Sequence, residues 1–441
     1  MEATYRDIWK LAYPIILASI AQTFISVSDT AFMGRVGEVE LAAIGMVSVY
    51  YLILFMIGFS YTKGTQIMVA RRVGEKKFKS AGFIFDHSMF SVLIIAVALF
   101  LIMRFGSTYA MELLVQDIHI QKAGTTYLEA RSFGLLFSFT GSVFLAFYMG
   151  IGRTPFLLFN ILVMSALNIT LNYLLIFGKF GFPEMGISGA AWASNIAEAV
   201  ALLMFAVHTV MAKLSKKYHL FKMRRVSVQL IKNITQLAFP IVLQTIISLS
   251  SWMIFFTFVE KMGAHEMAVS SVVKSIYMVI GIPAWGLSTT ANTVISNLMG
   301  QNRQAEVTSA LKKIIYMSLL FALLLALLCG FFPEICLAFY TNNPTVIAAG
   351  VPVLYVCLGA LFVYSVSTVL YHGVISTGST RASLFIELIT VVIYLGFIIS
   401  IFNIDGVSLP TVWISEIFYW FVLMVLTFIY LKTGHWKNIK I

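Results

Sequence analysis

The sequence predicts an all-α polytopic membrane protein with twelve transmembrane helices in two six-helix lobes related by an internal repeat. Three observations support this prediction. The chain of 441 residues is 60% hydrophobic and 11% charged. Its apolar residues fall into runs of membrane-spanning length, and the first half recurs in the second at an offset of 226 residues. Because soluble domains are usually about 25% charged, a chain this apolar needs lipid around it.

The apolar runs have the length and continuity of membrane helices. Residues 314–332, for example, contain no charged side chain. A helix of roughly 20 apolar residues spans the ~30 Å hydrocarbon core, whereas barrel strands are short and alternate in polarity. We therefore expect six spans in each half, near residues 11–33, 43–70, 83–104, 125–150, 155–178 and 187–213, and near 237–259, 267–296, 310–332, 347–372, 380–402 and 410–431.

The internal repeat predicts two lobes of the same fold. Residues 11–78 align with residues 237–304 without a gap, so that the segment 11–15 (Leu-Ala-Tyr-Pro-Ile) falls on 237–241 (Leu-Ala-Phe-Pro-Ile). A fixed long period indicates duplicated architecture. With an even number of spans, both halves insert in the same orientation. We expect an N-lobe at 1–213, a basic cytoplasmic linker at 214–232 and a C-lobe at 233–441.

The net charge of +11 is a signal of topology. Lys and Arg gather in alternate connections, namely Arg71, Arg72, Lys76, Lys77 and Lys79, then Lys213, Lys216, Lys217, Lys222, Arg224, Arg225 and Lys232, and finally Lys432, Lys437 and Lys440. Because cytoplasmic loops carry the excess of basic residues, both termini are expected in the cytoplasm. The basic balance then needs no nucleic-acid partner. No cleavable signal is expected either, since the first apolar run has full span length and a second follows at once.

A small set of polar residues inside the first-half spans could bind an ion. Asp29 lies within the first apolar run, and Phe255 takes its place in the second half. A charge inside a span is costly unless it is paired or hydrated, so it suggests function. Asn168 and Asn172 are four residues apart and share a helix face. Ser194 follows the small residues 189–191 (Gly-Ala-Ala), which allow close helix approach. One carboxylate with several neutral oxygens suits a proton or a small hard cation, while packing between helices is the alternative for Asn and Ser.

Other in-span residues have less specific interpretations. Pro14 and Pro240 occupy matching places, where each either kinks a helix or sits harmlessly in its first turn. The remaining charges are expected as structural pairs or cavity lining: Lys63, Arg131, Glu198, Lys274, Glu387 and Glu416. The sequence contains no P-loop, dinucleotide fingerprint, Ser/His/Asp pattern or metal-ligand spacing. We therefore expect no catalytic residues, no metal site, no cofactor and no enzymatic activity.

At these residues the chain resembles the multidrug and toxic compound extrusion (MATE) family of bacterial transporters. The resemblance covers nearly the whole chain and rests on several motifs in order. They are 29–37 (Asp-Thr-Ala-Phe-Met-Gly-Arg-Val-Gly), 64–70 (Gly-Thr-Gln-Ile-Met-Val-Ala) with Gly74, 127–131 (Tyr-Leu-Glu-Ala-Arg), 168–178 (Asn-Ile-Thr-Leu-Asn-Tyr-Leu-Leu-Ile-Phe-Gly) and 186–191 (Gly-Ile-Ser-Gly-Ala-Ala). It implies two six-helix lobes around a central cleft, which exchange organic cations or other amphiphiles for Na⁺ or H⁺.

The resemblance also implies a cation site in the N-lobe. In this family the site uses an acid of the first helix, an Asn and an Asp of the fifth and a Thr of the sixth. The matching residues are Asp29, Asn168, Asn172 and Ser194. This chain departs from the pattern because Asn172 replaces the fifth-helix Asp. The seventh- and tenth-helix positions that carry acids in one branch hold Ser248 and a residue near Ser365. We therefore expect Asp29 to be the main titratable group, and no separate ion in the second lobe.

These features together predict a secondary active antiporter. We expect it to export amphiphilic or cationic compounds (multidrug efflux) in exchange for H⁺ or Na⁺ by alternating access, as a multi-pass monomer of the bacterial cytoplasmic (inner) membrane. Its partners would be small-molecule substrates and membrane lipid. The alternative is a flippase for a polyprenyl-linked sugar or lipid, which needs a strongly cationic cavity, and Lys63, Arg131 and Lys274 are its only candidates. A membrane enzyme would need a cluster of acids or histidines at one face, which the sequence lacks.

Overall fold

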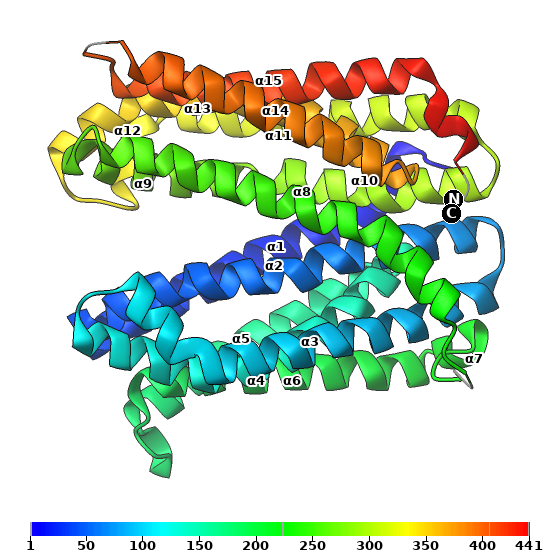
Figure 1. Ribbon diagram of the computed structural model, residues 1–441, viewed down its shortest axis with the longest axis horizontal. Helices are drawn as coiled ribbons and strands as arrows, with labels where there is room; N and C mark the ends of the chain where they lie inside the picture. Colours follow the sequence, from blue (N-terminus) through cyan, green and yellow to red (C-terminus); the bar gives the residue numbers. More distant parts are fainter. Residues whose placement is uncertain (1, 223–224, 405, 440) are drawn as a thin grey trace. The chain divides into compact units, whose positions relative to one another are not determined.

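A computed structural model describes residues 2–222, 225–404, 406–439 and 441, and every regular element in them is helical, which confirms the all-α prediction (Figure 1). Arg224 and Lys440 of the charge pattern lie outside these residues. The long helices of the first half are α1 (Tyr5–Val36), α2 (Glu38–Gly74), α3 (Phe78–Leu114), α4 (Ile118–Gly150), α5 (Pro155–Phe177) and α6 (Gly186–Met211). Those of the second half are α8 (Val228–Glu260), α9 (Ala264–Ile280), α10 (Ile282–Gly300), α11 (Val307–Phe331), α13 (Pro344–Ser376), α14 (Thr380–Phe402) and α15 (Leu409–Thr433).

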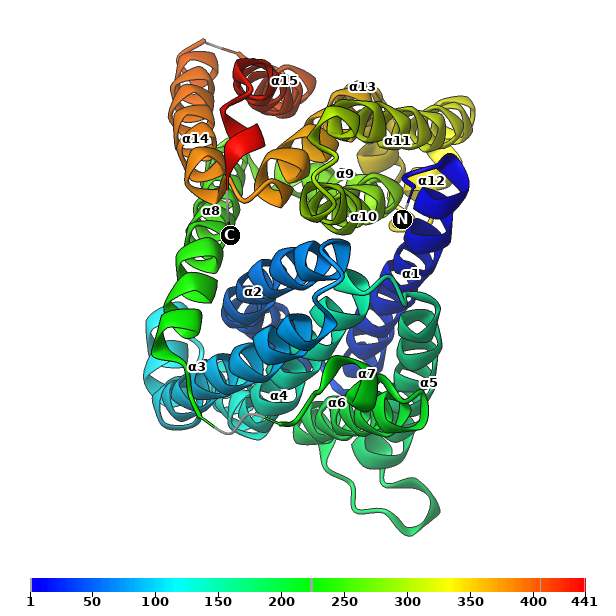
Figure 2. The same ribbon diagram turned by 90° about the vertical axis from the view of Figure 1, so that its right-hand side faces the viewer.

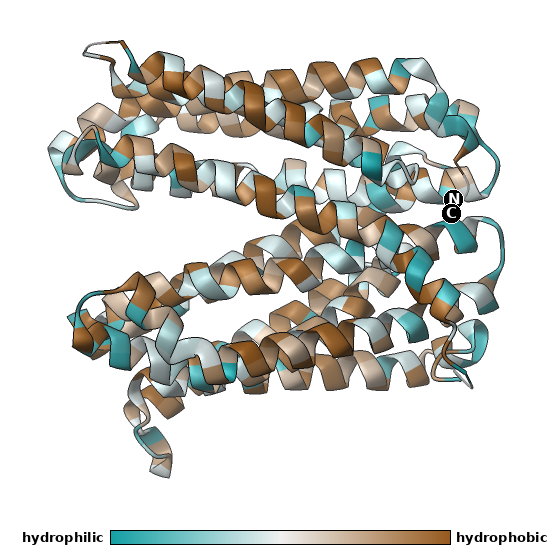
Figure 3. Ribbon diagram, viewed as in Figure 1, coloured by the Kyte–Doolittle hydropathy of each residue, from teal (hydrophilic) through white to brown (hydrophobic). Residues whose placement is uncertain are grey.

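The helices have the length and polarity of membrane spans. Within the described ranges, 11 helices are long and apolar enough to cross a membrane, or up to 12 spans if α9 and α10 count as one bent span. Hydrophobic residues cover the helices along their length, and hydrophilic residues gather toward the ends and connections (Figure 3). The expected twelve spans are therefore present, with one of them broken.

The broken span bends by 45° between α9 and α10. The segment at the bend is Gly281-Ile282-Pro283, with the proline in the first turn of α10. Proline lacks a backbone N–H and its ring clashes with the preceding turn, so a continuous helix cannot pass through it without distortion. The matching positions of α2 are 55–57 (Phe-Met-Ile), and α2 is continuous from Glu38 to Gly74. The span expected near 267–296 is therefore present as two helices that meet at this bend.

The sequence repeat extends to the helix boundaries. Helix α2 covers Glu38–Gly74, while α9 and α10 together begin at Ala264 and end at Gly300. Helix α4 covers Ile118–Gly150 and α13 covers Pro344–Ser376. All four pairs of ends differ by the same 226 positions as the sequence alignment. The same order of helices therefore recurs in each half, as duplicated architecture requires.

The chain forms two compact units, which we call the N-unit (residues 17–238) and the C-unit (residues 1–16 and 239–441). In the N-unit α4 packs along α2, α3 and α6, and α5 packs along α6 (Figure 2). In the C-unit α13 is the central helix, with α9, α10, α11 and α15 against it, while α14 packs against α15. The repeat-related helices α4 and α13 thus take the central place in their own units.

The boundaries of these two units differ from the expected boundaries of the lobes at the start of each half. In α1, Trp9 stacks on Phe321 of α11 with ring centroids 5.7 Å apart, and Lys313 donates to the Ala3 carbonyl at 3.1 Å. Residues 1–16 therefore belong to the C-unit. In α8, Thr235 lies 3.0 Å from the Tyr61 hydroxyl of α2, within the N-unit. Side-chain packing assigns the start of each first helix to the unit of the other half, which no local pattern in the sequence could reveal.

The linker between the halves is held against α3. It contains the short helix α7 (Leu214–Tyr218). The carboxylate of Asp86 accepts the backbone N–H groups of Phe221 at 2.9 Å and Lys222 at 3.1 Å. His87 Nε2 accepts the Ser227 N–H at 2.9 Å, and its Nδ1 lies 2.8 Å from the Phe83 carbonyl. Residues 223 and 224 lie outside the described ranges. The His87 side chain thus has a structural role in anchoring the linker.

Candidate functional site

Four polar residues of three N-unit helices form one continuous hydrogen-bonded chain. Asn172 Nδ2 on α5 donates to Asp29 Oδ1 on α1 at 2.6 Å and to Asn168 Oδ1 at 3.1 Å. Asn168 Nδ2 in turn donates to Ser194 Oγ on α6 at 3.0 Å. These are the four residues that the sequence singled out, and the structure places them together. We call them the Asp29 cluster.

Local helix geometry explains why the cluster assembles. Asn168 and Asn172 lie one turn apart on α5, so their side chains point to the same side. Helix α6 reaches α5 closely because Gly189 has no side chain: a Cβ there would lie 2.7 Å from the Leu175 carbonyl oxygen. The connection between these helices, residues 178–185, is tied to the end of α5, since Gly178 caps α5 in the left-handed region and Met185 donates to the Leu175 carbonyl at 2.9 Å. Ser194 is therefore held one hydrogen bond away from Asn168.

The Asp29 cluster contains one unsatisfied acceptor. Asn168 and Asn172 are 2% and 0% exposed, whereas Asp29 is partly exposed. Asn172 Oδ1 is buried and has no hydrogen-bond partner among the described residues. An unpaired buried polar atom costs about 1–3 kcal/mol. This oxygen is the group of the cluster at which a cation, or the proton of a neutral Asp29, could be accepted.

A buried ion pair lies between α4 and α6 of the same unit. Arg131 is 5% exposed, and its Nη1 donates to Glu198 Oε2 at 2.9 Å and to Asn195 Oδ1 at 2.7 Å. The guanidinium also lies 4.2 Å from the centre of the Tyr51 ring. An i,i+2 spacing puts two side chains on different faces of a helix, and Arg131 accordingly does not pair with Glu129. Glu129 instead binds Arg104 at 2.7 Å. The charge of Arg131 is therefore neutralised within the protein.

The two in-span acids of the C-unit are held by aromatic residues. Glu387 on α14 accepts the Tyr419 hydroxyl at 2.6 Å, and that hydroxyl lies 3.3 Å from Ser248 Oγ on α8. Glu416 on α15 accepts the Trp252 indole N–H at 3.1 Å. Sequence reasoning did not connect these acids with Ser248. The available signal was that aromatic residues follow Glu416 at i+3 and i+4, and so share its helix face.

The remaining in-span bases have aromatic neighbours. Lys63 Nζ lies 5.7 Å from the centre of the Phe59 ring, and Lys274 Nζ lies 4.9 Å from that of Phe256. In the part of the chain that the structure describes, no group of three or more His, Cys, Asp or Glu side chains is placed to hold a metal ion.

Comparison with known proteins identifies the family. The MatE family model matches residues 14–174 and again residues 240–400, so both ends of the two matches are separated by the repeat offset. The chain belongs to the MATE family. It is therefore a membrane transporter with a duplicated MatE region, and the resemblance drawn from its motifs is confirmed.

Several MATE relatives extend over most of the chain. It is 23% identical over 395 residues to "Probable multidrug resistance protein NorM" of Thermotoga maritima, which covers 88% of this chain and 83% of that protein. It is also 23% identical over 346 residues to "Uncharacterized transporter YisQ" of Bacillus subtilis, and this match covers 78% of this chain and 75% of that protein. A solved MOP superfamily transporter from Pyrococcus furiosus superposes with a TM-score of 0.91 at 18% identity, covering 99% of this chain and 97% of that one. At this identity the structural match establishes the fold.

Proposed function

We propose that this MATE transporter is a secondary antiporter that exports amphiphilic or cationic compounds by alternating access, driven mainly by protons. The observation that supports it best is the Asp29 cluster, in which a single carboxylate accepts a hydrogen bond from the Asn172 side chain at 2.6 Å. Relatives over most of the chain are named multidrug resistance proteins. We expect the protein to act as a monomer in the bacterial cytoplasmic membrane with both termini in the cytoplasm.

The composition of the cluster favours a proton over Na⁺. Hard cations bind several oxygen ligands and gain from each carboxylate among them. The cluster offers one carboxylate, two amide oxygens and one hydroxyl, and Asn172 is neutral where a second acid would add charge. Asp29 is partly exposed, so it can exchange a proton. The other three residues of the Asp29 cluster are buried, and a buried site disfavours charge that has no counter-charge. A proton on Asp29 could be donated to Asn172 Oδ1 once the Asn172 amide turns over, because this amide presents Nδ2 to Asp29. An exported cation would compete for the same carboxylate.

Pro14 and Pro240 are proposed hinges for the rocking motion. The structure places Pro14 inside α1, nine residues after the helix begins at Tyr5, so it is not a first-turn proline. Pro240 likewise lies inside α8. Each proline lies within two residues of the point where its helix passes from one compact unit to the other, after Ile16 in α1 and after Ala238 in α8. A missing backbone hydrogen bond makes each position easier to bend. Slower transport with unchanged substrate affinity in Pro14→Ala would support the hinge, and an unchanged rate would remove it.

The flippase alternative loses its best anion-binding candidate. A pyrophosphate-linked substrate needs free cationic side chains, but Arg131 is already paired with Glu198 and Asn195. No other contact among the described residues favours a flippase, so antiport remains the proposal.

The deciding experiment uses proteoliposomes with Na⁺ and pH gradients imposed separately. Efflux of ethidium should follow the pH gradient, and Asp29→Asn should abolish it, because a permanently neutral amide cannot exchange a proton. Glu129→Gln is the matched control, since Glu129 is an in-span acid whose partner is Arg104. Its efflux should equal that of the unmodified protein. Ethidium efflux driven by Na⁺ alone in the unmodified protein would overturn the proton preference.

A further inference from the structure

Helix α7 is a short amphipathic helix that packs against the ends of α3 and α6 in the N-unit (Figure 1). Its apolar residues Leu214 and Tyr218 are one turn apart and are 2% and 3% exposed. Gly82 of α3 allows a close approach, since a Cβ there would overlap the Tyr218 carbonyl oxygen. The Tyr218 ring packs edge to face on Phe78 at 5.7 Å and on Phe147 at 5.3 Å. The buried face of α7 therefore fixes this helix to the unit.

The opposite face of α7 is basic. Lys213, Lys216 and Lys217 are three and four residues apart along one helical turn, and all three are exposed. Arg153, which follows α4, is exposed as well, and its guanidinium lies within electrostatic range of Tyr218. None of these four cations forms an ion pair within the described ranges of the chain. We call the four residues the α7 patch.

Backbone and ring contacts hold the lysines of the α7 patch in place. Lys213 and His219, at the two ends of α7, have φ angles of 56° and 57°, in the left-handed region that non-glycine residues rarely adopt. Such a conformation persists only where the surrounding structure imposes it. Lys217 Nζ lies 4.9 Å from the centre of the Phe78 ring and 5.3 Å from that of Tyr218. The lysines therefore project from a fixed part of the backbone.

The α7 patch begins where a lipid-facing stripe of α6 ends. Four exposed apolar residues recur every one to four positions along α6: Leu203, Val207, Val210 and Met211. On a membrane helix such a stripe faces the acyl chains of the lipid. Lys213 follows Met211 after a single residue. The cations of the patch are therefore placed at the level of the lipid headgroups, next to a surface for acyl chains.

The internal repeat shows that the fold does not require these cations. At the offset of 226 residues Arg153 corresponds to Ser379 and Lys213 to Ile439. Ile439 packs against the turn at Gly378, where a Cβ would lie 3.2 Å from the Ile439 side chain. The two equivalent positions of the C-unit thus carry no charge, and duplicated architecture does not explain the α7 patch.

We propose that the α7 patch binds the phosphate headgroup of an anionic glycerophospholipid, whose acyl chains lie along the α6 stripe. Lys and Arg side chains form strong charge-assisted hydrogen bonds to phosphate oxygens. A bound phosphate would also relieve the repulsion among four cations that no acid balances. A lipid fits better than a soluble phosphate, because the apolar stripe adjoins the cations. Basic clusters at the cytoplasmic ends of membrane helices are a common site for anionic lipids. The proposed orientation of the termini places this lipid in the cytoplasmic leaflet, while the binding itself needs neither antiport nor Asp29.

Native mass spectrometry of the protein in dodecyl maltoside tests the proposal. Phosphatidylglycerol and phosphatidylcholine with the same acyl chains are titrated in turn, and the unmodified protein should retain phosphatidylglycerol at lower concentrations. The double variant Lys216→Gln/Lys217→Gln should weaken this binding roughly tenfold or more, since each cation near an anionic lipid surface strengthens binding about fivefold. Lys216→Arg/Lys217→Arg should keep it, because both charges remain.

The matched control is Lys432→Gln/Lys437→Gln, which removes two charges at the end of the other half. Both lysines are exposed, and their Nζ atoms lie 4.7 Å from the Phe428 ring centre and 5.9 Å from that of Trp436. Its affinity for phosphatidylglycerol should stay within about twofold of the unmodified protein. An equal loss in the two glutamine variants, with both folded by size exclusion, would overturn the proposal in favour of a general effect of net charge.

Two further measurements use the unmodified protein alone, so they decide the matter even if Lys216→Gln/Lys217→Gln does not fold. Equal retention of phosphatidylglycerol and phosphatidylcholine would contradict recognition of an anionic headgroup. Displacement of phosphatidylglycerol by an equal concentration of glycerol 3-phosphate would show a site for soluble phosphates and overturn the lipid as its occupant. Neither measurement involves a gradient, so loss of proton-driven efflux in Asp29→Asn concerns only the proposed function.

Discussion

Asn172 donates its side-chain amide to Asp29 at 2.6 Å, which joins two helices across 143 positions of the sequence. The same amide group donates to Asn168, while its own carbonyl oxygen has no partner among the described residues. A proton or a cation that binds at Asp29 would therefore affect the rest of the cluster through Asn172.

Replacement of Asn172 by Asp should shift coupling toward Na⁺. The change adds a second carboxylate next to Asp29, and each added charge strengthens the binding of a hard cation. Ethidium efflux from proteoliposomes should then gain a response to a Na⁺ gradient. Asn160→Asp is the control, since Asn160 lies on the same helix and donates to the Ala201 carbonyl, outside the cluster. A Na⁺ response in neither variant would show that charge at position 172 does not determine ion choice.

Removal of Arg131 should destabilise the N-unit strongly. Arg131→Met leaves Glu198 without its cation, and the loss of one partner of a buried pair costs about 3–5 kcal/mol. The double variant with Glu198→Gln should recover part of the loss, since no lone charge remains. Thermal unfolding in detergent measures both. Arg104→Met is the comparison, because its pair with Glu129 is more than a third exposed and should contribute at most about 1 kcal/mol. Equal effects at both arginines would contradict this account.

Addition of a methyl group at Gly189 should separate α5 from α6. In Gly189→Ala the new Cβ would meet the Leu175 carbonyl oxygen at 2.7 Å, a contact that the backbone can relieve only by moving. Overpacking of this kind costs about 1–3 kcal/mol. Gly141→Ala is the control, because no atom lies within 4 Å of a Cβ there. Its unfolding temperature should stay the same or rise, since Ala favours helix by up to about 1 kcal/mol. An unaltered unfolding temperature in Gly189→Ala would show that the helices can separate freely.

Loss of the Asp86 carboxylate should release the linker. Asp86 accepts two backbone N–H groups, from Phe221 and Lys222. Hydrogen bonds to a charged group contribute about 1.5–3 kcal/mol each. Limited proteolysis with trypsin should therefore cleave Asp86→Ala after Lys222 or Arg225 faster than the unmodified protein. Glu112→Ala, which changes an exposed acid in the last turns of α3, should leave the cleavage rate unaltered. Equal rates for all three proteins would mean that other contacts hold the linker.

Much of the architecture was predictable from the sequence, because membrane helices are specified by local composition. Apolar runs of sufficient length must become helices in lipid, where every backbone group needs an internal partner. The offset that relates Pro14 to Pro240 also relates the ends of α4 to those of α13. The polar residues of the Asp29 cluster could be found as well, since a polar side chain inside an apolar run is conspicuous. The break at Gly281-Ile282-Pro283 was missed although its signal was local.

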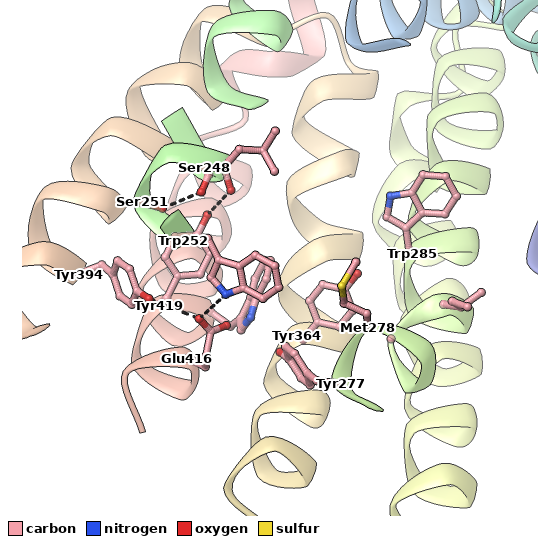
Figure 4. A pocket seen from close by; sticks show the side chains of 14 residues that line it. Ser248, Ser251, Trp252, Tyr277, Met278, Trp285, Tyr364, Tyr394, Glu416 and Tyr419 are labelled. Carbon is pink, nitrogen blue, oxygen red and sulfur yellow. Dashed lines mark hydrogen bonds between the residues drawn. The ribbon is translucent and has the colours of Figure 1, made fainter. Parts of the chain in front are cut away.

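Tertiary structure alone decided which distant side chains meet. Arg131 and Glu198 are 67 positions apart, and nothing in either segment specifies the partner. The cavity beside Glu416 (Figure 4) draws on residues from α8 through α15, and half of its 14 lining residues are aromatic side chains that look like ordinary lipid-facing residues in the sequence. The start of α1 packs with the C-unit because Trp9 and Ala3 find partners on α11. Hydropathy measures how strongly a side chain prefers lipid or the protein interior to water. Packing decides which neighbour it touches, and so whether an in-span acid meets an arginine, as Glu198 does, or aromatic side chains, as Glu416 does.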